Sequence, residues 1–276
     1  KEKLFSFDDF PVHFYDNEIE KPVILLLNGF GASTEFQWYK LLPALGTKNR
    51  VILINLLHFG KTKPVLEENC TVDNQVNLVY TLIQRLRIKK VRIAGISYGG
   101  LIASEFAEKH EPLVSELILL NAPTKFLDLE NLRELCHKSG VDTIHDFFAP
   151  SDYLGLKKQF ELAYYSTPWL PSFIIKSFYD ELCKPYIDQW KLMVENLLGE
   201  YENLKLKNYN YKGNTTLIWG EDDVIIPVSV GLSLNKTYTN SRLECISKCG
   251  HLPSIEQSDR VIEILEKTFY NTVYSK

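Results

Sequence analysis

Short, largely apolar runs alternate with longer amphipathic segments over most of the chain. The runs Pro22–Leu27, Arg50–Asn55 and Val91–Ile96 predict strands that helices cover on both faces of a sheet. Before the last of these runs, Asp73–Arg87 repeats apolar residues at helical spacing. This alternation of strand and helix predicts right-handed crossovers and an α/β fold with a mostly parallel central sheet.

The rest of the pattern completes the predicted sheet. Two short mixed segments, Lys3–Phe7 and Pro11–Tyr15, predict an antiparallel hairpin at its edge. A further buried strand begins at Leu117 and is ended by Pro123. The remaining expected elements are helices near Phe36–Leu45, at Leu101–His110 and at Ser254–Tyr270, and strands at Thr215–Trp219 and Arg242–Ser247.

The strand pattern stops at about Thr124 and resumes after Lys212. Helical spacing of apolar residues replaces it in Leu129–Lys138, Tyr153–Tyr165 and Tyr186–Leu198. Aromatic residues are dense in this stretch. We expect most of them to form the core of the helical segment and several to line an apolar pocket.

Composition excludes several classes of function. The chain has 276 residues, of which 45% are hydrophobic and 24% charged, which is ordinary for a globular protein. A net charge of −4 offers no basic surface for nucleic acid, and no apolar run is long enough to span a membrane. Five scattered cysteines fit reduced thiols in a cytoplasmic enzyme. We expect a monomer or a homodimer. The first residue is Lys1, so a removed signal peptide and secretion stay open.

The first candidate for chemistry is the sequence Gly95-Ile96-Ser97-Tyr98-Gly99, which lies between a predicted strand and a predicted helix. A turn this abrupt strains its central residue and needs small neighbours, which Gly95 and Gly99 provide. It exposes the Ser97 hydroxyl at its tip. The sequence resembles the G-x-S-x-G nucleophile elbow of the α/β-hydrolases. The alternative is an ordinary turn in which the serine caps a helix.

The same family resemblance extends to an acid and a base. Trp219-Gly220 begins a stretch similar to the family's W-G-x-x-D-x-x-x-P motif, in which Asp223 and Pro227 have the expected register. The neighbouring Asp222 does not, and we expect it to cap the turn or face water. His251 follows Gly250 after the last predicted strand, where the family keeps its base. The resemblance therefore implies a triad of Ser97, Asp223 and His251, in that chain order.

An oxyanion hole is implied by the glycine-rich sequence after the first strand. Asn28-Gly29-Phe30-Gly31 stands where many hydrolases have a His-Gly-x-Gly-like loop, although Asn28 replaces the histidine. By resemblance, the backbone N–H groups of Phe30 and Tyr98 hold the oxyanion. The alternative is a plain glycine turn into the next helix. We expect Phe30, Tyr98, Leu252 and Trp169 to contact the substrate.

Two polar residues at other strand ends receive no catalytic role. His58 lies in a loop that departs from the family pattern, and we interpret it as a packed residue. Asn121 stands where some hydrolases keep their acid, so the acid is expected later in the chain. The family also implies the domain organisation: a hydrolase core of residues 1–123 and 213–276, with 124–212 as a helical cap or lid.

These features predict a serine hydrolase that needs no metal or cofactor. We expect it to cleave a carboxylic ester or thioester with a small to medium apolar acyl group, as a carboxylesterase or lipase-like enzyme. A carbon–carbon bond hydrolase of vinylogous diketones is the nearest alternative, although Arg133 is the only arginine in the cap to hold a substrate carboxylate. A ligand receptor that retains the triad is the alternative from outside enzymes.

Overall fold

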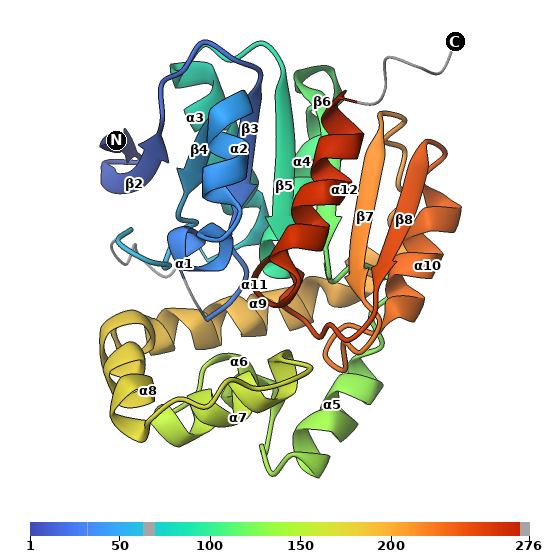
Figure 1. Cartoon of the computed structure of the whole chain (residues 1–276). Coiled ribbons are helices and arrows are strands. Elements are labelled where there is room, and N and C mark those ends of the chain that lie inside the picture. Colours follow the sequence, from blue (N-terminus) through green and yellow to red (C-terminus); the bar gives the residue numbers. More distant parts are fainter. Residues whose placement is uncertain (32, 63–69, 271–276) are drawn as a thin grey trace.

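One mostly parallel sheet runs through the centre of the protein (Figure 1). The structure is a computed structural model and describes residues 1–31, 33–62 and 70–270. Within these residues the eight strands of the sheet lie in the order β1-β2-β4-β3-β5-β6-β7-β8. Their bounds are β1 Glu2–Phe7, β2 Phe10–Asp16, β3 Val23–Leu27, β4 Arg50–Ile54, β5 Val91–Ile96, β6 Val114–Leu120, β7 Thr215–Gly220 and β8 Ser241–Ile246.

The predicted hairpin and parallel strands are confirmed. Strands β1 and β2 pair in antiparallel fashion, with Leu4 opposite His13, and β2 joins β4 at the sheet edge. All other neighbours, from β4 to β8, are parallel. Strand β3 is buried at four of its five positions, because helices cover both faces of the sheet (Figure 1).

The helices outside the insertion pack on the two faces of the sheet. Figure 1 shows α2 and α12 on one face and α3 and α4 on the other, while α10 packs against β7 and β8. These elements are α1 Thr34–Trp38, α2 Leu42–Lys48, α3 Val72–Arg85, α4 Tyr98–Lys109, the 3-10 turn η2 Glu111–Leu113, α10 Val228–Thr237, α11 Pro253–Glu256 and α12 Ser258–Tyr270.

Three boundaries differ from the sequence-based expectation. The helix expected near Phe36–Leu45 is two helices, because the chain turns at Tyr39–Leu41 and Pro43 lies in the first turn of α2. The closing helix is broken at Gln257, whose backbone is not helical. Strand β6 ends at Leu120 rather than at the proline, because Asn121 has a left-handed backbone with a φ of 45°.

The described residues of the insertion form helices and connecting loops without a strand, and they lie beyond the carboxyl ends of the parallel strands, at the bottom of Figure 1. Its helices are α5 Leu129–Lys138, α6 Ile144–Phe148, α7 Tyr153–Ala163, α8 Ser172–Phe178, the single turns η3 Tyr179–Cys183 and η4 Lys184–Tyr186, and α9 Ile187–Leu206.

The loop after β4 ties α9 to the sheet. The indole N–H of Trp190 donates to the His58 carbonyl at 2.9 Å, and the Tyr186 hydroxyl donates to the Gly60 carbonyl at 2.5 Å. His58 itself is fully buried, with a φ of 69° and its Nε2 3.2 Å from the Cys70 sulfur. Burial lowers the pKa of the His58 imidazole to about 4. His58 therefore packs as a neutral ring.

The turn from β5 into α4 requires Gly95 in particular. A Cβ atom on Gly95 would overlap the carbonyl group of Gly99, whereas a Cβ on Gly199, in α9, would meet no atom within 4 Å. We expect Gly95→Ala to lower the free energy of unfolding by about 3 kcal/mol or more. The matched Gly199→Ala should raise it by roughly 0.5–1 kcal/mol. Urea unfolding followed by circular dichroism measures both. Equal stabilities for the two variants would contradict the close approach.

The buried neutral histidine makes stability depend on pH. Between pH 6.5 and about 4 the unfolded chain binds a proton at His58 that the native protein does not, so stability falls as the pH falls through this window. We expect His58 to account for about 3 kcal/mol of this loss. In His58→Asn, which tolerates the left-handed backbone, the slope of unfolding free energy against pH should flatten. Exposed His137→Asn serves as control, and a wild-type slope in both variants would argue against a buried neutral His58.

Candidate active site

Ser97 occupies the strained turn between β5 and α4. Its φ of 51° and ψ of −124° are unusual for a residue with a side chain. Its backbone N–H donates to the Leu120 carbonyl at 2.9 Å, which continues the pairing of β5 with β6. Its side chain makes no capping hydrogen bond to α4. The hydroxyl is thus not used as a helix cap, the alternative that the sequence left open.

The loop after β3 passes directly beside this turn. A Cβ on Gly29 would lie 2.9 Å from the Cβ of Ser97, and a Cβ on Gly99 would lie 2.5 Å from the Asn28 carbonyl oxygen. The Gly29 N–H is already bound to the Gln37 side chain at 2.6 Å. Phe30 follows immediately and shares two cavities with Ser97. The backbone amides of Phe30 and Tyr98 thus remain the predicted oxyanion donors.

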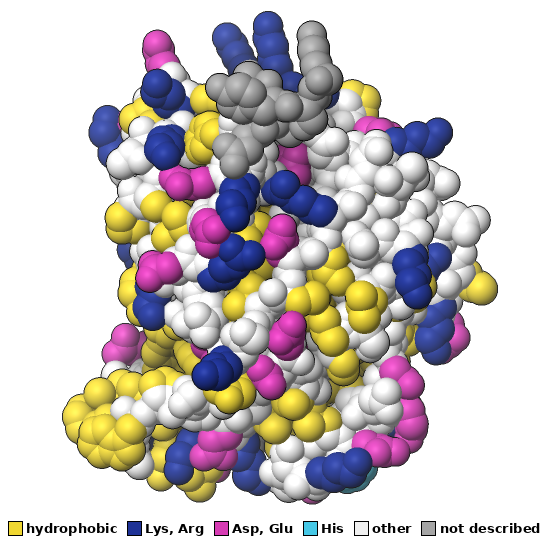
Figure 2. Space-filling model, turned by 45° about the vertical axis from the view of Figure 1, so that its right-hand side comes forward, with side chains coloured by type: hydrophobic (Ala, Val, Ile, Leu, Met, Phe, Trp, Pro, Cys, Tyr) yellow, Lys and Arg dark blue, Asp and Glu magenta, His cyan; other side chains and the backbone are white. Residues whose placement is uncertain are grey.

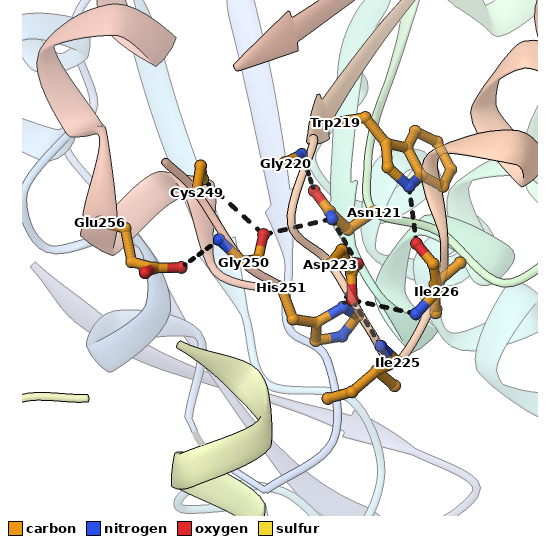
Figure 3. Close-up of polar contacts among 10 residues, drawn as sticks. All are labelled: Asn121, Trp219, Gly220, Asp223, Ile225, Ile226, Cys249, Gly250, His251 and Glu256. Carbon is orange, nitrogen blue, oxygen red and sulfur yellow. Dashed lines mark hydrogen bonds and ion pairs between the residues drawn. The ribbon is translucent and has the colours of Figure 1, made fainter. Parts of the chain in front are cut away.

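Asp223 and His251 form a buried pair at the ends of β7 and β8 (Figure 3). His251 Nδ1 lies 2.7 Å from Asp223 Oδ2. The other carboxylate oxygen of Asp223 accepts the backbone N–H groups of Ile225, at 2.8 Å, and Ile226, at 3.0 Å. With one oxygen held by the backbone, the carboxylate presents the other to the imidazole. The adjacent Asp222 is exposed, as expected.

Asn121 completes this network, a role that sequence reasoning missed. Its amide nitrogen donates to the same Asp223 oxygen that His251 contacts, and more weakly to the Gly250 carbonyl at 3.4 Å (Figure 3). Its amide oxygen accepts the Gly220 N–H at 3.3 Å. Its position at the carboxyl end of β6, next to β7, after which Asp223 follows, could have indicated this role.

The loop that carries His251 is also fixed from the helical insertion. The His251 N–H donates to the Ala163 carbonyl, at the end of α7, at 2.7 Å. The Glu256 carboxylate accepts the N–H of Gly250 at 2.9 Å and that of Tyr165 at 2.7 Å. Burial raises the pKa of the Glu256 carboxyl.

Two cavities meet at Ser97. The first extends under α5, α6 and α9 and is almost wholly apolar, and the second contains His251. Ser97, Phe30, Phe148 and Ile225 line both. No lysine or arginine is among the described residues that line either cavity. The remaining lining residues of the first cavity are Tyr98, Leu101, Pro123, Thr124, Leu127, Leu129, Leu132, Ile144, Val194, Leu197, Leu198, Tyr201, Leu204 and Ile226.

The residues expected to contact substrate divide into two groups. Phe30, Tyr98 and Leu252 line these cavities, and burial raises the pKa of the Tyr98 hydroxyl far above its usual value. Trp169 lines neither, and its side chain is 86% exposed. Its place between Pro168 and Pro171, in the connection from α7 to α8, carries it to the surface, which corrects the expectation.

Among the described residues, no three His, Cys, Asp or Glu side chains lie close enough together to hold a metal ion. None of the helices in these residues is both long and apolar enough to cross a bilayer.

Comparison with known proteins gives matches along almost the whole chain. The 2-hydroxy-6-oxononadienedioate/2-hydroxy-6-oxononatrienedioate hydrolase 1 of Pseudomonas putida is 22% identical over 91% of this chain and 89% of that protein. Monoacylglycerol lipase ABHD6 of Homo sapiens is 24% identical over 89% of this chain and 74% of that protein.

A solved structure and a family match agree with these relatives. A serine hydrolase from the polyaromatic hydrocarbon-degrading bacterium Cycloclasticus zankles superposes with a TM-score of 0.87 at 18% identity, covering 100% of this chain and 99% of that one. Residues 22–258 match the family described as alpha/beta hydrolase fold. The chain therefore belongs to the alpha/beta hydrolase fold family.

Proposed function

We propose that this protein is a serine hydrolase that cleaves the carboxylic ester, or thioester, of an apolar acyl group through an acyl-enzyme on Ser97. The observation that carries the proposal is the pair of cavities at Ser97. One holds His251, and the other is an apolar pocket long enough to pass under three helices of the insertion. A serine beside a buried Asp–His pair, with an apolar pocket attached, suits acyl transfer.

In the proposed mechanism, His251 takes the proton of the Ser97 hydroxyl as the serine oxygen attacks the carbonyl carbon. The contact of Nδ1 with Asp223 places the N–H there and leaves the Nε2 lone pair to act as base. The Phe30 and Tyr98 amides stabilise the oxyanion, at the amino end of α4, whose dipole favours negative charge. His251 then protonates the leaving alcohol, and water activated by His251 releases the acid.

No lysine or arginine of the described residues lines either cavity, which weighs against the carbon–carbon alternative. The relative from Pseudomonas putida is named for a dioate substrate, which carries two carboxylates. Binding such an anion out of water requires a cation or several donors. Arg133, the one arginine in the insertion, is exposed and pairs with Glu130 at 3.0 Å. The apolar lining favours a substrate like that named for the monoacylglycerol lipase, with an uncharged acyl chain.

We further propose that residues 124–212 act as the lid of this site and that 1–123 and 213–276 form the catalytic core. The support is that α5, α6 and α9 roof the apolar cavity over Ser97. A receptor that binds ligand in the same cavity without multiple turnovers would keep this lid, so turnover is the quantity to measure.

Turnover and labelling of Ser97 test the proposal. We expect a fluorophosphonate probe to label the wild type, and p-nitrophenyl esters of increasing chain length to be hydrolysed with a preference for medium acyl chains. Ser97→Ala should lose labelling and at least about a thousandfold in kcat, because no other group supplies the nucleophile. Ser229→Ala, an exposed serine of α10, is the control.

The alternatives give different results in the same assay. Cleavage of 2-hydroxy-6-oxo-6-phenylhexa-2,4-dienoate with a higher kcat/KM than any ester would favour the carbon–carbon reaction. Labelling of Ser97 without repeated turnover on any ester would favour the receptor.

Asn121 should affect the chemical step without affecting substrate binding. Its removal leaves the Asp223 oxygen that faces His251 without its amide donor and frees the Gly250 carbonyl. We expect Asn121→Ala to lower kcat by about 10- to 100-fold with little change in KM, because the imidazole is less well oriented. Steady-state kinetics on one ester measures both constants. A variant in which KM alone rises would show that Asn121 acts on the pocket instead.

A further inference from the structure

The connection from α7 to α8 and the first turn of α8 expose four large apolar side chains. Trp169 is 86% exposed and Phe173 73%, and Leu170 and Ile174 beside them are also exposed. We call these four residues the α8 surface. Figure 2 shows hydrophobic side chains gathered at the lower left of the molecule, at the level where Figure 1 places α8. Side chains of this size are normally buried or used in contacts.

An open, largely apolar cleft extends from the α8 surface to residues that also line the cavity at Ser97. Leu170 and Ile174 line this cleft together with Tyr39 and Phe178. Two further lining residues, Phe36 and Phe160, also line the cavity that contains Ser97 and His251. Their rings lie 5.0 Å and 5.9 Å from the ring of Phe178. The aromatic side chains of Phe36 and Phe160 therefore border both the cleft and the cavity that contains Ser97.

The charges beside the cleft are of the sign that lipid phosphates require. Lys40 and Lys248 line it, and Lys176 is exposed on α8. The acidic residue of the cleft, Glu256, uses both carboxylate oxygens to accept backbone N–H groups. Tryptophan and phenylalanine beside lysine are the combination found on proteins that bind at the surface of a bilayer.

We propose that the α8 surface docks this protein on a lipid surface and that the adjoining cleft leads an acyl lipid from that surface to Ser97. The second part rests on the proposed function, and the first does not. A protein partner or a second copy seated here would cover the cleft, whereas a bilayer both covers the exposed rings and supplies the acyl chain. The geometry thus favours lipid as the occupant.

Trp169 can serve as an intrinsic fluorescence probe of binding to lipid. Of the chain's four tryptophans, Trp38, Trp190 and Trp219 are fully buried, so only Trp169 can enter a bilayer. Mixing the protein with vesicles of phosphatidylcholine containing roughly one third phosphatidylglycerol should shift Trp169 fluorescence to shorter wavelength. Brominated lipid should quench it. Binding needs no chemistry, so Ser97→Ala should bind as the wild type does.

A matched pair of double variants locates the surface. Trp169→Ser/Phe173→Ser should lower partition onto the vesicles, measured by flotation, at least about tenfold. Leu4→Ser/Leu206→Ser, which alters exposed apolar residues outside the α8 surface, should leave partition unchanged. Hydrolysis of water-soluble p-nitrophenyl acetate should stay within about twofold of wild type in both, which shows that they are folded.

Other results would overturn the proposal. The proposal fails if the wild type does not float with vesicles. It also fails if the two double variants partition equally onto them. A wild-type dimer in sedimentation that the Trp169→Ser/Phe173→Ser change dissociates, without any vesicle binding, would identify the α8 surface as a subunit interface instead. Vesicle binding by a wild type that hydrolyses no ester would support docking while contradicting the proposed function.

Discussion

The close approach of two backbone segments at the end of β5 is the constraint on which the site depends. The β5 strand and the α4 helix meet so tightly that Gly95 has no room for a Cβ, and Gly99 has none because Leu27 and Asn28 at the end of β3 pack against it. At this turn Ser97 has a positive φ of 51°, and its side chain makes no capping hydrogen bond to the helix. Because the Gly29 loop also packs against Ser97, close packing at this point positions both the proposed nucleophile and its proposed oxyanion donors.

The other half of the site depends on which strands are neighbours. Asn121, Asp223 and His251 follow β6, β7 and β8, which are adjacent and parallel, so their side chains emerge at one edge of the sheet. Hydrogen bonds connect them: the Gly220 N–H donates to Asn121, and both the Asn121 amide and the His251 Nδ1–H donate to Asp223. A buried hydrogen-bond network stabilises the fold most when each of its polar groups has a partner. Asp223 accepts four such contacts, from Ile225, Ile226, Asn121 and His251.

Features that depend on residues close together in the sequence could be predicted from it. The strands were predictable because burial on both faces requires a continuous apolar run, and the turn at Ser97 was predictable because Gly95 and Gly99 lie two residues from it in the sequence. Asn121 was not, since its role depends on the register between β6 and β7, which the sequence does not state. We expected Trp169 in the pocket because aromatic residues are frequent in the insertion. Their frequency does not show which face of the insertion a given ring occupies. The exposure of Trp169 is a property of the fold.

The attachments of the helical insertion decide which part of it can move. At one end α7 is held through the Ala163 carbonyl and Tyr165 N–H, and at the other η4 and α9 are held through Tyr186 and Trp190. Between these ties α8 meets the core through the rings of Phe178 and Phe36. Ring contacts are weak individually and have no fixed partner, unlike the hydrogen bonds on either side. On the route proposed for the substrate, between Phe36 and Phe160, we therefore expect side chains to be displaced while the His251 loop, which α7 holds, stays in place.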